Sequence, residues 1–241
     1  MVTSKFEAGL VQTEAAAKKG SSKSMRGRRV VVGYPEGAPH GLDVYFSADV
    51  ETDGSIPGPF SMLSFALVYA GAYDGTTFYK PPAYERAFYA ELKPISDRFE
   101  KEALDVNGLD RGYLAAHGQD PVAAMTAAAK WVDDMAGMGS PVIVAYPLSF
   151  DWSWLHWYFV NFSEHGSPFG HSRGFDIKTA IAVKLGRMVS NSGRSRIPEA
   201  VRSQFAHTHH ALDDAVEQAE IFSNIFMMES VSDGSVPEFG G

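Results

Sequence analysis

The sequence predicts an α/β fold in which a five-stranded mixed sheet is flanked by helices. Three strand-like segments follow one another with links too short to hold a helix. Farther along, a short, wholly apolar run lies between two helical segments, and a long amphipathic segment comes near the end of the chain. Short links join antiparallel strands, whereas a strand between helices is buried on both faces and commonly pairs in parallel. The two kinds of segment together predict a mixed sheet.

The first three strands are expected at residues 44–54, 61–73 and 84–94. The first is an apolar run that leads into Asp49 and Glu51 and ends at a turn signal, Asp53-Gly54. The next two are rich in aromatic and β-branched residues. Because their links are short, the three strands should form an antiparallel meander.

The rest of the chain alternates helical and strand-like segments. Pro121 favours the first position of a helix. In order, we expect a short helix at 97–104, a helix at 122–135, a buried strand at 141–146, an aromatic helix at 152–162, a strand or helix at 175–185, an exposed loop at 186–195, a short helix at 197–205 and a long helix at 207–231.

The composition is typical of a globular protein without disulfides. Of 241 residues, 45% are hydrophobic and 21% are charged, and none is cysteine. The lack of cysteine excludes disulfides, thiolate metal sites and cysteine nucleophiles. No secretory signal and no segment long enough to cross a bilayer is found, so we expect a soluble, cytoplasmic protein with no membrane partner.

The charge divides the chain into a basic tail and an acidic body. The net charge is −8, yet residues 1–40 hold seven Lys and Arg against three Glu. We therefore expect a flexible basic tail at 1–40, one domain at 41–231 and a second tail at 232–241. An acidic body argues against a passive nucleic-acid-binding protein, although an enzyme can meet phosphates through bound metal ions.

Four carboxylates stand out against this predicted fold. Asp49 and Glu51, two apart on a strand, project from the same face. Asp151 follows the buried strand at 141–146, and Asp214 lies early in the last helix. If the first and fourth strands are parallel neighbours, their C-terminal ends meet where ligands bind in open α/β sheets.

Such a cluster suits hydrolysis at phosphorus with two divalent ions. Carboxylates and waters favour Mg²⁺ or Mn²⁺, and a nearby histidine can accept the proton of the attacking water. By helical geometry alone His210, four residues before Asp214, is better placed than His209. A zinc-like cluster of these histidines with His207 lacks a clear set of partners.

The motifs DVETDG at 49–54, SFDW at 149–152 and HHALDDA at 209–215 together resemble those of the DEDDh family of 3′–5′ exonucleases. The resemblance covers roughly residues 44–230. It implies a ribonuclease-H-like fold and removal of nucleotides from the 3′ ends of single-stranded DNA or RNA. Two departures are Pro147, where the family often has Asn, and Asp53, where it often has a small hydroxyl residue.

By position, the resemblance implies a role for each of the five residues. Asp49 would bridge two metal ions, Glu51 and Asp214 would hold the ion that binds the attacking water, and Asp151 would serve the other ion. His209 would be the general base, with His210 as the alternative.

Substrate contacts are expected at the first motif and at nearby apolar residues. These substrate-binding candidates are Val50, Thr52, Met62, Leu63 and Phe150. Met62 and Leu63 are included because the resemblance implies apolar residues there against the terminal base, although we expect at least one of them to be a core residue. A homodimer is suggested only by analogy and by the aromatic helix. A non-catalytic nucleic-acid-binding domain and a phosphohydrolase of free nucleotides are the competing functions.

Overall fold

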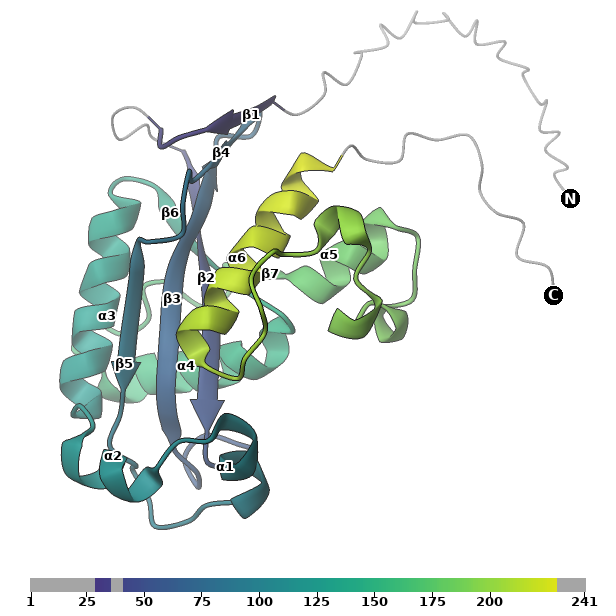
Figure 1. The fold of residues 1–241 in the computed structure, drawn as a ribbon. Helices are drawn as coiled ribbons and strands as arrows, with labels where there is room; N and C mark the ends of the chain where they lie inside the picture. Colours follow the sequence, from purple (N-terminus) through teal and green to yellow (C-terminus); the bar gives the residue numbers. More distant parts are fainter. Residues whose placement is uncertain (1–28, 36–40, 229–241) are drawn as a thin grey trace, which may run out of the picture.

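The computed structural model describes residues 29–35 and 41–228, which form a mixed sheet with helices on both faces (Figure 1). The strands are β1 (Arg29–Val32), β2 (Asp43–Thr52), β3 (Met62–Tyr73), β4 (Thr77–Lys80), β5 (Ala87–Glu91), β6 (Ser140–Ala145) and β7 (Gly174–Asp176). The α-helices are α1 (Lys101–Asn107), α2 (Arg111–His117), α3 (Pro121–Ala136), α4 (Leu148–Phe162), α5 (Ile177–Lys184) and α6 (Ala211–Met227). Short 3₁₀ helices are η1 (Val189–Asn191), η2 (Arg194–Arg196) and η3 (Glu199–Val201).

The sheet order is β1-β4-β3-β2-β6-β7, and β5 pairs with another part of β3. The predicted meander is confirmed, because β3 is antiparallel to both β2 and β5. The predicted parallel pairing of the first and fourth strands is also confirmed, in β2 and β6. The strand number was wrong: the described residues form seven strands rather than five.

The additional strands are short. β1 and β4 have four residues each and pair with one another in parallel at one edge of the sheet. β1 lies within the segment 1–40 that was predicted to be a tail; most of that segment, and the predicted tail at 232–241, lie outside the described residues. Four residues are too few to establish an alternating pattern, which explains why the sequence did not reveal these strands.

Several predicted helices begin or end elsewhere. α4 begins at Leu148, so Asp151 lies in its first turn rather than in a preceding loop. α6 begins at Ala211, so the histidines at 207–210 precede it. The ambiguous segment 175–185 holds both the end of β7 and α5, and the predicted helix at 197–205 is reduced to η3.

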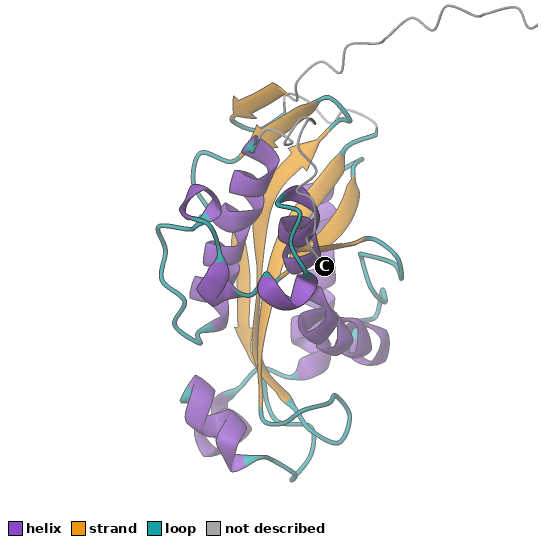
Figure 2. Cartoon of the chain, turned by 90° about the vertical axis from the view of Figure 1, so that its right-hand side faces the viewer, coloured by secondary structure: helices purple, strands orange, loops and turns teal. Residues whose placement is uncertain are grey.

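Alternate residues of β2 face two different cores. Val44, Phe46 and Ala48 pack with residues of α3 and α4, whereas Tyr45 packs with α6. The helices accordingly flank the sheet on both sides in the view of Figure 2. The same alternation turns Asp49 and Glu51 toward α6, as the two-residue period predicts.

The aromatic residues of α4 belong mainly to the core. Trp154 and Tyr158 are fully buried, and Trp152 and Trp157 pack against the same cluster. The aromatic character of this helix is therefore explained by packing within the chain. Among the described residues, no helix combines the length and apolar character that a membrane span requires.

The end of β2 extends past its parallel neighbour. Pairing with β6 stops at Ser47, whereas β2 continues to Thr52. α1 and α2 lie beyond this end of the strand (Figure 1). The C-terminal part of β2 therefore lies at the edge of a space between α1, α4 and α6.

Candidate active site

The four predicted carboxylates converge at the end of β2. Asp49 and Glu51 come from β2, Asp151 from the first turn of α4 and Asp214 from the first turn of α6. Oxygens of Asp49, Glu51 and Asp214 lie within 4.8 Å of one another. All four residues are buried, at 1–9% exposure. Residues up to 165 positions apart in sequence therefore form one cluster.

Asp151 is held against β2 by the strand's own backbone. Its Oδ1 accepts a hydrogen bond from the Val50 N–H at 3.1 Å. That N–H lies past the last residue of β2 that pairs with β6, so no residue of β6 competes for it. The contact fixes the start of α4 to the end of β2.

Asp214 organises the loop that carries the histidines. Its two oxygens accept hydrogen bonds from the backbone N–H groups of Thr208, at 2.7 Å, and His209, at 3.0 Å. His207 Nδ1 lies 2.7 Å from Asp214 Oδ2. His209 has a φ of 59°, a left-handed conformation that is uncommon for residues other than glycine. The carboxylate at the start of α6 thus fixes an unusual turn.

Of the two candidate bases, His209 lies at the cavity. His207 and His209 both line it, and their rings meet edge to face at 4.5 Å. His210 instead packs its ring against Tyr89, with centroids 5.1 Å apart. The helical geometry that favoured His210 does not apply, because both histidines precede the first helical residue.

Gln218 was missed by the sequence analysis. It is fully buried on α6, and its Nε2 donates a hydrogen bond to Asp49 Oδ1 at 2.7 Å. The signal was its spacing, one helical turn after Asp214, which places both side chains on the same face. Gln218 orients the Asp49 carboxylate from α6.

The carboxylates are electrostatically frustrated. Burial raises the pKa of Asp49 well above its ordinary range, and three neighbouring carboxylates raise it further. Burial, together with Asp214 and Asp151, raises the pKa of Glu51 to about 8. Burial also raises the pKa of Asp151 to about 7, although the Val50 N–H favours its charged form. The cluster therefore holds more negative charge than its surroundings compensate.

A divalent cation fits this set of donors. Asp49, Glu51 and Asp214 offer hard oxygen ligands within reach of one another, which is the donor chemistry that Mg²⁺ and Mn²⁺ prefer. A positive ion would also relieve the repulsion that raises the carboxyl pKa values. His207 and His209 form a second possible donor group with Asp214.

The carboxylates line an open cavity of about 550 Å³. Of the predicted substrate-binding residues, Val50, Thr52 and Phe150 line it, and Phe150 is 40% exposed. Met62 and Leu63 do not line it: both are fully buried, and the Met62 N–H donates to the Tyr158 hydroxyl. The structure supports the core interpretation for these two residues, because the start of β3 lies beneath the surface.

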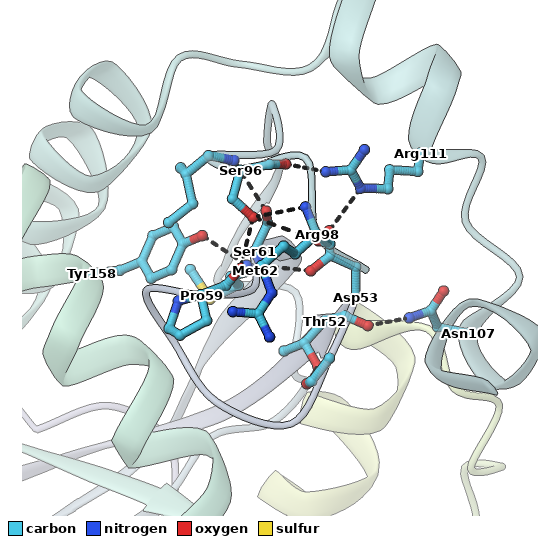
Figure 3. Close-up of polar contacts among 12 residues, drawn as sticks. Thr52, Asp53, Pro59, Ser61, Met62, Ser96, Arg98, Asn107, Arg111 and Tyr158 are labelled. Carbon is cyan, nitrogen blue, oxygen red and sulfur yellow. Dashed lines mark hydrogen bonds and ion pairs between the residues drawn. The ribbon is translucent and has the colours of Figure 1, made fainter. Parts of the chain in front are cut away.

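The far wall of the cavity comes from α1, and Asp53 ties this region to β2 (Figure 3). Asp53 is fully buried and pairs with Arg111 of α2, with Oδ2 and Nε 2.8 Å apart. It also accepts the Ser61 N–H at 2.5 Å. Asn107 of α1 donates to the Thr52 carbonyl at 3.0 Å. Asn107 therefore ties the α1 wall to β2, and the unusual Asp53 of the first motif anchors the neighbouring α2.

Arg194 was also missed. It lies in η2, within the segment 186–195 that was predicted to be an exposed loop, yet it lines the cavity. It pairs with Glu217 of α6 and lies over the ring of Tyr146, 5.1 Å from its centre. Arg187 and Arg196 lie nearby in the same Gly- and Ser-rich stretch, and nothing in the sequence singles out Arg194 among them for such a position.

Comparisons with known proteins agree with this arrangement. No family model matches the chain. The chain is 34% identical over 181 residues, 75% of its length, to the 3′-5′ DNA exonuclease Cap18 of Escherichia coli, and it covers 90% of that protein.

Two solved structures share the fold. The nuclease domain of 3′hExo, a DEDDh family member bound to rAMP, matches with a TM-score of 0.55 at 11% identity, over 76% of this chain and 90% of that one. Cell-death related nuclease 4 (CRN-4) matches with a TM-score of 0.53 at 14% identity, over 78% of this chain and 64% of that one.

Proposed function

Because this chain belongs to the DEDDh family of 3′–5′ exonucleases, we propose that it removes nucleotides from the 3′ ends of single-stranded DNA, assisted by two Mg²⁺ or Mn²⁺ ions. The observation that carries the proposal is the convergence of four buried carboxylates with His209 at one cavity. DNA is favoured over RNA because the 34% identical relative is named a DNA exonuclease.

In this proposal each protein group has one task. Asp49, Glu51 and Asp214 would hold the ions, with Asp151 completing the set from α4. Bound ions would supply positive charge opposite the reacting phosphate and would make a water molecule more acidic. His209 is the group that accepts a proton from the attacking water, since its ring is at the cavity and its backbone is fixed by Asp214.

The cavity also suggests how a chain end is received. Phe150 exposes an aromatic face on one side, and Val106 of α1 is 57% exposed on the other. Aromatic faces stack on unpaired bases with little dependence on sequence. A single-stranded end entering between α1 and α4 would bring its last linkage to the carboxylates.

The experiment uses oligonucleotides labelled at either end, with and without Mn²⁺ or Mg²⁺. Stepwise shortening of a 5′-labelled DNA strand, with release of the 3′ label as mononucleotide, is the expected result. Hydrolysis of mononucleotides alone would replace the proposal with a phosphohydrolase. Binding without cleavage would reduce the protein to a nucleic-acid-binding domain. Equal rates on RNA would remove the preference for DNA.

A further inference from the structure

Arg194 is the single lysine or arginine among the described residues that line the cavity. Every other charged residue on this wall, histidines aside, is an aspartate or glutamate. A nucleic acid brings one negative charge per linkage, so an acidic cavity needs positive charge from the protein as well as from ions. The position of this one cation therefore bears directly on substrate binding.

The guanidinium is held from two sides. Nη1 pairs with Oε2 of Glu217, which is 8% exposed on α6, and Nη2 donates to the Tyr146 carbonyl at 3.5 Å. Tyr146 is itself fixed, because its hydroxyl donates to the Ser192 carbonyl at 2.5 Å. Two anchors on separate elements restrict the rotamers of a side chain that would otherwise be mobile.

These contacts leave part of the guanidinium free for a ligand. Arginine carries five N–H donors in a planar fork, and the described hydrogen bonds of Arg194 use two of them. The side chain is 24% exposed, on the cavity side. Its charge also reaches the carboxylates, because it offsets part of the rise in the pKa of Asp49 and Asp151.

We propose that Arg194 contacts the phosphate of the 3′-terminal linkage, and that Glu217 and Tyr146 position its guanidinium for this contact. The inference rests on the proposed function and deepens it by assigning a phosphate-binding residue. A planar guanidinium binds phosphate oxygens in pairs, which a lysine in its place could not reproduce. Arg194 thus recognises the substrate, while Glu217 acts through Arg194.

The test measures binding rather than turnover. A 5′-fluorescein oligothymidylate, and the same strand with a neutral methylphosphonate at its last linkage, are titrated by anisotropy in Ca²⁺, with a gel to exclude cleavage. The neutral linkage should weaken wild-type binding by about tenfold, and Arg194→Gln should weaken binding of the unmodified strand by a similar factor. The neutral linkage and Arg194→Gln remove the same contact. When both are present, the loss of affinity should therefore be little greater than the loss from either change alone.

Further variants separate this role from a structural one. Lys130→Gln changes the charge equally, at an exposed site on α3, and should keep the full methylphosphonate effect. Arg194→Gln leaves Glu217 buried without its cation, so the melting temperature should fall; Arg194→Gln/Glu217→Gln should recover stability but not binding. Arg194→Lys should recover only part of the affinity.

Three results would overturn the proposal. One is an undiminished methylphosphonate effect in Arg194→Gln, and another is wild-type binding by the double variant. The third is a wild-type affinity that is unchanged by a methylphosphonate at the last linkage but weakened by one at the penultimate linkage, in a second modified strand. If the wild-type protein fails to shorten a 5′-labelled strand, the proposed function fails, which is distinct from losing the Arg194 contact in an active enzyme.

Discussion

Without divalent ions, the free energy of unfolding should fall as the pH rises from about 5 to 8. In the folded protein the pKa of Glu51 is raised to about 8 and that of Asp151 to about 7. Exposed carboxyl groups of the unfolded chain titrate near 4. A raised folded-state pKa contributes stability that is complete below the unfolded pKa and is lost as the pH rises through the folded one. In this window the folded state therefore binds more protons, and stability decreases.

The size of this change in unfolding free energy follows from how many more protons the folded state binds than the unfolded state. One additional proton on the folded state corresponds to about 1.36 kcal/mol per pH unit. Glu51 alone would therefore cost roughly 4 kcal/mol between pH 5 and 8. Asp151 contributes in the lower part of the same window, but less than its separate value because interacting carboxyls titrate as a set. For a domain of this size, 4 kcal/mol corresponds to about 8–16 °C in melting temperature.

The assay is urea unfolding, followed by tryptophan fluorescence, in EDTA and in Mg²⁺ across the pH series. Mg²⁺ should flatten the pH dependence, since metal binding requires deprotonated carboxylates. Glu51→Gln should make the slope of the unfolding free energy against pH less steep by the contribution of about one proton, which is about 1.36 kcal/mol per pH unit. The exposed Glu164→Gln is the matched control and should leave the slope unchanged. Stability that is constant or rises with pH in EDTA, or a wild-type slope in Glu51→Gln, would refute the reasoning.

Three further predictions concern single side chains. Asp49→Ala should abolish nuclease activity on labelled DNA while raising the metal-free melting temperature at pH 8, because a buried repelling carboxylate is removed; retained activity would contradict its role as a ligand. His209→Ala should lower kcat by about 10²–10⁴-fold in single-turnover cleavage, and a wild-type rate would rule it out as the base. Arg111→Ala should destabilise the protein by about 3–5 kcal/mol in urea, because Asp53 stays buried without its partner. Arg111→Met/Asp53→Asn should regain most of that loss; no recovery would show that the ion pair is not the cause.

Local periodicity was enough to predict the central part of the site. The two-residue period of a strand places Asp49 and Glu51 on one face, and the apolar run at 141–146 identified the parallel neighbour of their strand. That pairing also brought Asp151 to the same edge of the sheet, whereas the inclusion of Asp214, on the last helix, came from the family resemblance. The choice of His209 came from the family pattern, and the loop geometry before α6 explains it.

The rest of the site depends on contacts that no local pattern encodes. Arg194 reaches the cavity because Glu217 and Tyr146, distant in sequence, hold it there. The spacing of Gln218 places it on the same face of α6 as Asp214, but its partner Asp49 comes from β2 and is brought opposite it only by the fold. Met62 was a candidate for substrate contact because related enzymes place apolar residues at this position, yet an apolar residue there can equally well belong to the core, as it does here. Only tertiary structure separates such alternatives.

The Asp53–Arg111 pair has a consequence for how specificity can diverge. The four carboxylates of the site come from β2, α4 and α6. The segment that holds α1 and α2 forms a wall beside them, and the Asp53–Arg111 ion pair and the Asn107 hydrogen bond attach this segment to the end of β2. If residues 95–118 were exchanged for a segment of another shape that kept the Asp53–Arg111 ion pair, we expect the shape of the cavity to change while the four carboxylates stay in place. One wall of the cavity therefore comes from a part of the chain that supplies none of the four carboxylates.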